Sequence, residues 1–327
     1  MIEADQQRSD SEHYHAIVAE IYSEIERFAP PLQALARPFF ERLTQGEFSR
    51  VVALLPAWLA DLAPVDPIIS HKLGVAHLYG WWYYAVQDDL LDGSAPAAAL
   101  LGGHLALLKM VETYRALGLV DSPCWADFER LALTSAEHYA LELQTRFATL
   151  AELTPERLAL VTVEFIMGRG APFYFNTLAQ LHLAGFAPDA PLRHDLLATL
   201  RCFTAARQIG DDAGDWLADL RAGQLNYVSA RMILDMYARG LISSATDLDL
   251  ERLIGYQTGA EEFWAEIERT HQQLCQQALD RLGHYGESRI GALIQRQMAT
   301  DAKHWAAGRA YRARVRELFG AVIYHSG

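Results

Sequence analysis

Residues 80–93 read GWWYYAVQDDLLDG, an apolar helical stretch that ends in three aspartates and a glycine. Residues four apart share one helix face, so Asp88 and Asp92 point together, with Asp89 beside them. Carboxylates in a last helical turn face the negative end of the helix dipole, which costs roughly 0.3–1 kcal/mol each when they are exposed. We therefore expect a cation near this helix end.

A second stretch, residues 207–223, reads RQIGDDAGDWLADLRAG and repeats this arrangement. Asp211, Asp215 and Asp219 form a ladder at helical spacing, and Asp212 lies next to its first member. Hard divalent cations such as Mg²⁺ prefer carboxylate oxygens. One acidic triplet at a helix end is usually solvated surface. Two triplets with the same spacing and the same glycine stop favour a shared metal site.

The composition limits the class of protein. With 51% hydrophobic and 21% charged residues the chain is globular, and its net charge of −13 argues against a nucleic acid partner. No apolar run reaches the ~20 residues of a membrane span. The polar N-terminus is unlike a secretory signal, and the three cysteines match no zinc pattern, so we expect a cytoplasmic protein.

The residue pattern predicts helices almost throughout. Alternating β-branched runs are scarce, while Ala, Leu, Glu, Arg and Gln dominate. We expect helices over residues 11–28, 31–44, 48–60, 68–92, 97–117, 125–148, 155–167, 171–184, 192–220, 227–239, 248–283 and 286–319. No linker or repeat divides the chain, so we expect one all-α domain of about ten to twelve helices over residues 11–327, after a mobile tail at residues 1–10.

The two acidic stretches define a candidate site if their helices face each other across a bundle. Like charges that close need cations, and carboxylate-bound Mg²⁺ commonly holds phosphate oxygens as well, so the expected ligand is a diphosphate. Below the first cluster Trp81 and Tyr84 share its helix face, and Thr204 lies below the second. We expect these side chains to line a cavity for a hydrocarbon chain. Core packing is the commoner explanation of such aromatic residues taken alone, and only their place directly before the aspartates makes the two explanations about equal.

These residues resemble the class I isoprenoid synthases: prenyl elongases, squalene and phytoene synthases, and terpene cyclases. Residues 88–92 (DDLLD) resemble the first DDxxD motif of that superfamily. Residues 211–215 (DDAGD) are similar to the second DDxxD of prenyl synthases, while the wider ladder also fits the spacing of the terpene cyclase metal triad. The resemblance implies an all-α isoprenoid synthase-like bundle around a central apolar cavity, three Mg²⁺ ions and an isoprenyl diphosphate substrate. It leaves a homodimer open.

The resemblance also assigns roles to individual residues. It implies that the catalytic metal ligands are Asp88, Asp89, Asp92, Asp211, Asp215 and Asp219, with Asp212 as a further metal ligand. Arg169, between two glycines at an expected helix break, lies where cyclases place a diphosphate-sensing arginine. Arg309, Tyr311 and Arg312 resemble the cyclases' terminal Arg-Tyr pair in altered order. A surface arginine and a solvated basic helix face are the respective alternatives. Phe173 is expected in the substrate cavity.

The choice among reactions rests on basic residues. A prenyl elongase must hold a second diphosphate, yet no Lys or Arg follows Asp92 until Lys109. One diphosphate site favours a terpene synthase that ionises an allylic isoprenyl diphosphate and releases diphosphate. Two alternatives stay open. One is a prenyltransferase, either chain-elongating or head-to-head, because residues 219–224 resemble part of the second squalene and phytoene synthase motif. The other is a non-catalytic partner subunit of this fold.

Overall fold

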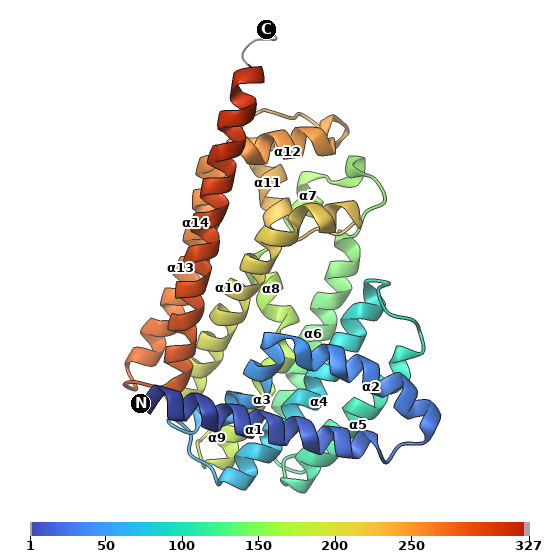
Figure 1. Cartoon of the computed structure of the whole chain (residues 1–327), viewed down its shortest axis with the longest axis vertical. Coiled ribbons are helices and arrows are strands. Elements are labelled where there is room, and N and C mark those ends of the chain that lie inside the picture. The colour runs from blue at the N-terminus through green and yellow to red at the C-terminus, as the bar shows by residue number, and fades with distance from the viewer. Residues whose placement is uncertain (1, 324–327) are drawn as a thin grey trace. The chain divides into compact units, whose positions relative to one another are not determined.

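The computed structural model describes residues 2–323, and every regular element in that part of the chain is a helix (Figure 1). These described residues form fourteen α-helices and two short 3₁₀ helices, Leu150–Glu152 and Ala245–Asp247. The all-α prediction is confirmed. The α-helices outnumber the expected ten to twelve because two predicted helices are each interrupted.

The helices form two compact units. The first comprises Met1–Ala132, Pro172–Leu197 and Ser288–Ile290, and the second comprises Leu133–Ala171, Ala198–Glu287 and Gly291–Gly327. The first aspartate cluster belongs to the first unit and the second cluster to the second. The single domain over residues 11–327 and the mobile tail at residues 1–10 stay predictions.

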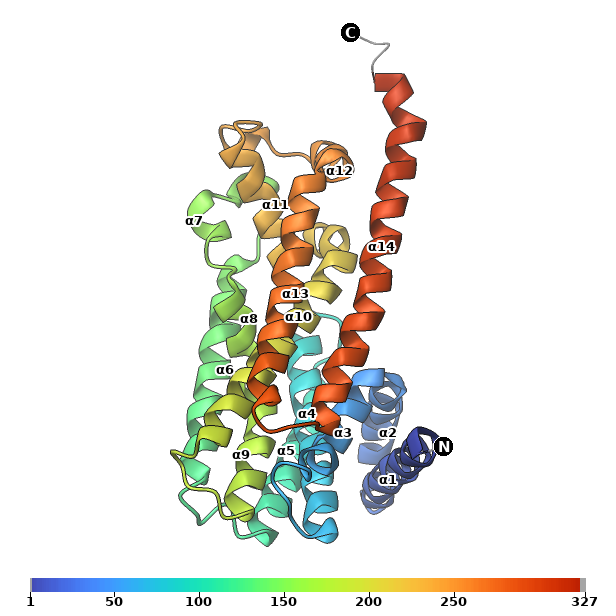
Figure 2. The same cartoon turned by 90° about the vertical axis from the view of Figure 1, so that its left-hand side faces the viewer.

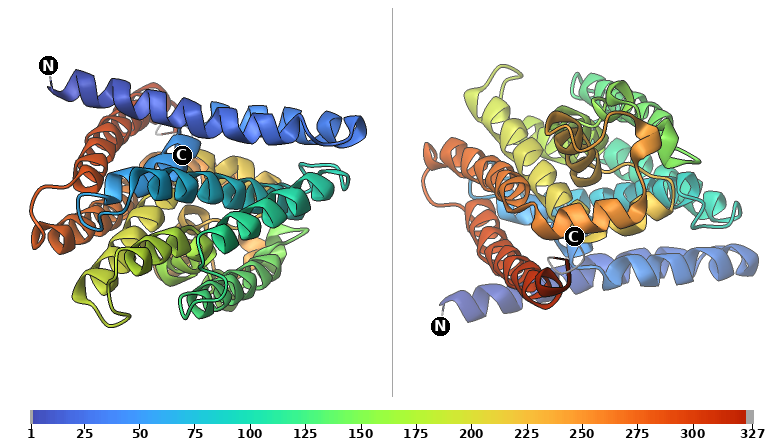
Figure 3. Two further views of the ribbon diagram at one scale, coloured as in Figure 1. Left: turned by 90° about the horizontal axis from the view of Figure 1, so that it is seen from below. Right: turned by 90° about the horizontal axis from the view of Figure 1, so that it is seen from above.

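The first unit is built around α4 (Pro67–Leu91), the helix that leads into the first aspartate cluster. This helix packs against α3 (Glu47–Leu59) and α5 (Ala99–Ala116) (Figure 3). The carboxylate of Asp66 caps its N-terminus by accepting a 2.8 Å hydrogen bond from the backbone N–H of Ile68. The unit also contains α1 (Ile2–Ile25), α2 (Pro30–Gln45) and α9 (Ala171–Leu183).

Aromatic side chains fill the core of the first unit. Trp82 of α4 is buried against Phe40, with ring centroids 5.2 Å apart. Tyr114 meets Phe175 edge to face at 5.0 Å. Such rings dominate the energetics of a core because each one buries a large apolar area. This packing fixes α4 within its unit, and with it the helix end that carries three aspartates.

The second unit carries the second aspartate cluster on α10 (Pro191–Arg221). In this unit α13 (Glu261–Gly283) and α14 (Arg289–Ile323) run side by side in opposite directions (Figure 2). Thr199 of α10 donates a 3.3 Å hydrogen bond to the backbone carbonyl of Ala278 on α13. The other helices are α7 (Pro155–Leu158), α8 (Val163–Arg169), α11 (Tyr227–Ala238) and α12 (Leu250–Gly259), together with the part of α6 (Trp125–Thr145) that begins at Leu133.

Two of the predicted helices are each divided into two helices in the structure. The helix predicted over residues 248–283 ends at Gly259, and α13 begins at Glu261 with two acidic residues in its first turn, which suit a helix N-terminus. The helix predicted over residues 155–167 is divided after Leu158, because the side chain of Thr162 starts α8 by accepting from the backbone N–H of Phe165 at 3.1 Å. In addition, α1 begins at Ile2, upstream of the predicted start.

Among the helices that the structure describes, none combines the length and the apolar character needed to cross a bilayer.

Candidate functional site

The first aspartate cluster lies at the C-terminal end of α4. Asp88 and Asp89 occupy its last turn and Asp92 is the residue that caps it, so all three carboxylates are close to the helix end. Asp89 forms an ion pair with Arg42 of α2. The guanidinium of Arg42 therefore places a positive charge at this helix end, and the binding of a metal ion there stays a prediction.

Both acidic helices end in the same hydrogen-bonded turn. After α4, the backbone N–H of Ser94 donates to the carbonyl of Asp89 at 2.9 Å. After α10, the backbone N–H of Gln224 donates to the carbonyl of Asp219, also at 2.9 Å. The glycine before each donor has a positive φ, 70° in one turn and 76° in the other, as this helix stop requires. The predicted helix stops are confirmed.

The second cluster divides by burial along α10. Asp211 and Asp215 are exposed and lie one turn apart. Asp219, one turn further, is partly exposed, whereas Asp212 is only 4% exposed. Asp211 lies 3.6 Å from the guanidinium of Arg207 on the preceding turn. The expected ladder thus presents two open carboxylates and a third that is partly covered.

Asp212 is held by hydrogen bonds on both carboxylate oxygens. The side-chain amide of Gln208 donates to one at 2.7 Å, and the backbone N–H of Tyr227 donates to the other at 2.8 Å. Burial raises the pKa of Asp212 to about 7, against the opposing effect of these two donors. Asn226, which caps α11, donates to Asp219 at 2.7 Å. The role of Asp212 as a metal ligand stays a prediction, and these contacts count against it.

Arg169 lies where α8 ends and α9 begins at Ala171, so the predicted helix break is confirmed. Its guanidinium forms a 2.9 Å ion pair with Glu142 and lies 5.3 Å from the ring centre of Tyr139. The positive charge of Arg169 lowers the pKa of Asp212, although burial has the larger and opposite effect. The second unit therefore brings one predicted diphosphate-binding arginine into electrostatic contact with Asp212 of α10.

Two predicted cavity residues of the first unit belong to one aromatic cluster. Trp81 contacts Phe48 at a centroid distance of 4.9 Å, and Phe48 contacts Phe173 at 5.5 Å. Phe48 was not predicted; it joins the two predicted residues from α3. His77 packs on Phe173 at 4.9 Å. Burial lowers the pKa of His77 to about 3, while the backbone at Val52 and at Phe173 acts in the opposite direction. Neither ring nitrogen has a hydrogen-bond partner of normal geometry among the described residues.

The other two predicted cavity residues have local partners. Tyr84 packs edge to face on Tyr83 at a centroid distance of 5.0 Å. Burial raises the pKa of Tyr84, so its hydroxyl stays protonated at neutral pH. The hydroxyl of Thr204 donates to the backbone carbonyl of Leu200 at 2.9 Å. Their roles as cavity walls stay predictions.

The predicted C-terminal basic residues lie on α14. Arg309 forms an ion pair with Glu268 of α13. The side chain of Arg312 is buried and lies over the ring of Trp264, 4.5 Å from its centre. Tyr311 is 68% exposed. The three residues therefore do not share one environment, and their role in binding diphosphate stays a prediction.

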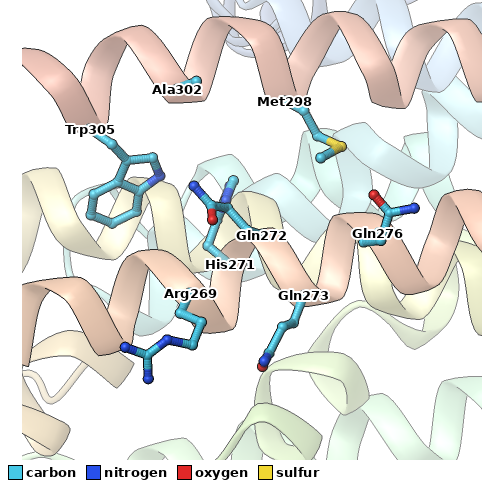
Figure 4. A pocket seen from close by; sticks show the side chains of 8 residues that line it. All are labelled: Arg269, His271, Gln272, Gln273, Gln276, Met298, Ala302 and Trp305. Atoms are coloured by element: carbon cyan, nitrogen blue, oxygen red, sulfur yellow. The ribbon is translucent and has the colours of Figure 1, made fainter.

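A histidine–aspartate pair joins α13 and α14 beside the second cluster. His271 Nε2 lies 3.1 Å from Asp301, and both residues are buried. His271 lines a cavity of about 350 Å³, with Trp305 and Met298 projecting from α14 on either side of it (Figure 4). Partial desolvation raises the pKa of Asp211, the positive charge of Arg207 lowers it, and the negative charges of Asp215 and Asp301 raise it further. This pair was not predicted.

Carboxylate oxygens are suitable Mg²⁺ ligands, but few of them lie together in the structure. The residues that the structure describes contain no group of three or more His, Cys, Asp or Glu side chains placed to hold a metal ion. Mg²⁺ usually takes one or two protein carboxylates and completes its shell with water and substrate phosphates. Asp211 and Asp215, exposed and one turn apart on α10, match that demand. The donor set suits an ion that arrives together with a diphosphate.

Comparisons with known proteins give a likeness in structure but none in sequence. Neither the family models nor the curated proteins contain a match to this chain. The structure is similar to the crystal structure of a candidate geranylgeranyl pyrophosphate synthase from Corynebacterium glutamicum. The TM-score is 0.63 at 15% sequence identity, over 90% of this chain and 95% of the other. The fold is that of an isoprenoid synthase. The predicted fold class is confirmed.

Proposed function

We propose that this chain is a Mg²⁺-dependent class I terpene synthase, a cyclase that ionises an allylic isoprenyl diphosphate and releases diphosphate. One observation carries the proposal: two long helices each end in a cluster of aspartates at helical spacing, in a chain with an isoprenoid synthase fold. The glycine turn itself is an ordinary helix stop, which also ends α5, α9 and α11, so the weight lies on the repeated carboxylates.

The carboxylates are proposed to hold the metal ions that receive the diphosphate. The proposed ligands are Asp88, Asp92, Asp211, Asp215 and Asp219. Bound Mg²⁺, three ions in enzymes of the kind that the sequence resembles, supplies Lewis-acid stabilisation of the departing diphosphate. Asp89 and Asp212 are proposed as weaker metal ligands, because an arginine pairs with Asp89 and hydrogen bonds occupy both oxygens of Asp212.

Basic residues would bind the remaining diphosphate oxygens. Arg169 is the first candidate, because its ion pair with Glu142 holds the guanidinium fork in place near the second cluster. A donor that is already positioned loses little entropy when charge develops on the leaving group. Arg309 and Tyr311 are further candidates for the same role.

Aromatic and apolar side chains would enclose the hydrocarbon part of the substrate. Trp81, Phe48 and Phe173 form a contiguous cluster in the first unit. Aromatic faces stabilise a nearby cation, and a dry wall keeps water from quenching it. Tyr84 and Thr204 are proposed as further wall residues.

The basic residues of the first unit support a single diphosphate site. Arg37 is paired with Glu26 at 3.1 Å, and Lys109 lies within 3.2 Å of both Glu24 and Glu112. A second diphosphate, as in chain elongation, would have to displace these carboxylates. This supports a cyclase over an elongase.

A prenyltransferase is the second candidate function. Its support is the structural likeness to a candidate geranylgeranyl pyrophosphate synthase, together with the DDAGD sequence at residues 211–215. Fold alone does not fix the reaction, because one fold carries several chemistries. The two functions differ in whether a second substrate is required.

A substrate panel tests the proposal. The purified chain is incubated with geranyl, farnesyl or geranylgeranyl diphosphate, with Mg²⁺ or with EDTA, and with or without isopentenyl diphosphate. Diphosphate release and the products of the organic layer are measured together. A cyclase releases diphosphate from one allylic substrate alone and yields a hydrocarbon or alcohol.

Each other outcome has a distinct meaning. Release that needs isopentenyl diphosphate and gives a longer chain replaces the cyclase with an elongase. Release that condenses two allylic molecules identifies a head-to-head transferase. No release with any substrate removes the catalytic proposal and leaves the non-catalytic partner.

A further inference from the structure

Charged side chains join α13 and α14 along their length. Arg316 pairs with Glu261, and Arg309 pairs with Glu268. A cavity of about 450 Å³ lies in this part of the seam. Its lining residues are Glu261, Trp264, Ala265, Glu268, Arg309, Ala310, Arg312, Ala313 and Arg316. All of them belong to α13 and α14, and none belongs to α10.

Arg312 stands out among these residues. It is only 9% exposed and forms no ion pair or hydrogen bond with any residue that the structure describes. Its one close partner is Trp264, whose ring centre lies 4.5 Å from the guanidinium carbon. Burial lowers the pKa of Arg312, and the positive charges of Arg309 and Arg316 act in the same direction. Glu268 and Glu261 act in the opposite direction, and burial has the largest effect.

The arrangement leaves hydrogen-bonding capacity unused. A guanidinium carries five N–H donors that point outward in its own plane. An aromatic ring stacked on it attracts the charge through the flat face but accepts no hydrogen bond from these donors. Buried charges in proteins are normally paired. Glu268 is already paired with Arg309, and Glu261 with Arg316. The charge of Arg312 therefore has no carboxylate of its own among these five residues.

Small residues leave room for a ligand at that edge. Ala265, Ala310 and Ala313 line the cavity where larger side chains would fill it. A Cβ atom on Gly308 would lie 3.2 Å from Nη1 of Arg312, so the glycine leaves space for the guanidinium. The volume lies within the usual range for small-molecule sites.

We propose that this seam, the Arg312 pocket, binds a phosphate-bearing small molecule through the guanidinium edge of Arg312. Phosphate oxygens match the planar donor fork of arginine, and the bond would be charge-assisted. No aspartate of α10 lines the pocket. Binding therefore needs no divalent cation. The proposal does not rest on the cyclase activity, and it gives Arg312 a ligand separate from the diphosphate of the reaction.

Metal-free binding tests this proposal. Inorganic phosphate and inorganic diphosphate are titrated separately into the full chain by calorimetry, in EDTA at constant ionic strength. We expect saturable binding of at least one of them. Arg312→Met should weaken it about tenfold or more, because a charged hydrogen bond is lost. Arg314→Met, an exposed arginine two residues away on the same helix, and Asp215→Ala should each change it less than twofold.

Three outcomes would overturn the proposal. The first is no binding of either probe without Mg²⁺. The second is binding that Arg312→Met leaves unchanged. The third is binding that Asp215→Ala weakens as much as Arg312→Met does, which would assign the arginine to the reaction's diphosphate. If Arg312→Met does not fold by circular dichroism, Arg312→Lys replaces it. The lysine keeps the charge but loses the fork, and the same tenfold criterion applies to it.

Discussion

The backbone N–H of Tyr227 donates a 2.8 Å hydrogen bond to the carboxylate of Asp212. With Gln208 on the other oxygen, this bond ties the middle of α10 to the start of α11. One member of the acidic motif is thus part of the scaffold. Its neighbours Asp211 and Asp215 remain exposed on the same helix.

Replacing Asp212 should therefore destabilise the fold. In Asp212→Ala the buried N–H of Tyr227 loses its acceptor, which costs about 1–3 kcal/mol. The matched control is Asp211→Ala, an exposed neighbour whose loss should change stability by less than about 0.5 kcal/mol. Urea unfolding followed by circular dichroism measures both. Equal stability of the two variants would contradict a structural role for Asp212.

The buried ring of His77 should make stability depend on pH. Its pKa is about 3 in the folded chain, against about 6.5 when unfolded, so the unfolded chain binds more protons between these values. This contribution to stability is complete above pH 6.5 and is lost as the pH falls toward 3. Between pH 7 and 5 the chain should lose about 2 kcal/mol that His77→Phe retains.

An exposed histidine provides the control for that measurement. His194→Phe removes a histidine that is exposed on α10, so it should leave the pH dependence of the native chain in place. Urea unfolding at pH 7, 6 and 5 compares the three proteins. Parallel loss of stability in His77→Phe and in the unmodified chain would show that this ring is not held neutral.

Arg169 should matter to turnover more than to folding. Arg169→Met removes the charge near the second cluster and should lower kcat/KM about tenfold or more, the cost of a charged hydrogen bond. Arg201→Met, an exposed arginine on α10, is the control and should leave kcat/KM within twofold. Steady-state diphosphate release with the preferred substrate gives both values. Similar kinetics in the two variants would exclude Arg169 from the site.

Local sequence patterns were sufficient for the ends of the acidic helices. A glycine that adopts positive φ stops a helix through its own backbone, so the stops after Asp92 and near Asp219 follow from residues within one turn. The same holds for the break at Arg169, which flanking glycines mark. The interruption at Ala260 is also local, but the residue type carries no turn signal.

Contacts between residues that are far apart in the sequence could not be predicted from local patterns. Arg42 pairs with Asp89 across 47 positions, and no periodicity links them. Asp211 and Asp212 are adjacent and identical in type, yet Asp212 is buried and Asp211 is exposed. The reason is that only Asp212 faces the start of α11. Phe48 joins the predicted cavity residues from another helix for the same reason. Such roles depend on how helices pack.

The central claim is that the two aspartate clusters serve one reaction, and a double-mutant cycle on Mg²⁺-dependent diphosphate release tests it. Asp88→Ala and Asp215→Ala, one from each unit, are measured alone and combined, with the exposed helical Asp280→Ala as control. Residues that act as a unit are strongly non-additive. We expect each single variant to lose about a thousandfold or more in turnover. The double variant should be hardly worse, and circular dichroism should remain unchanged. Near-full activity in either single variant, or losses that simply multiply, would contradict the account.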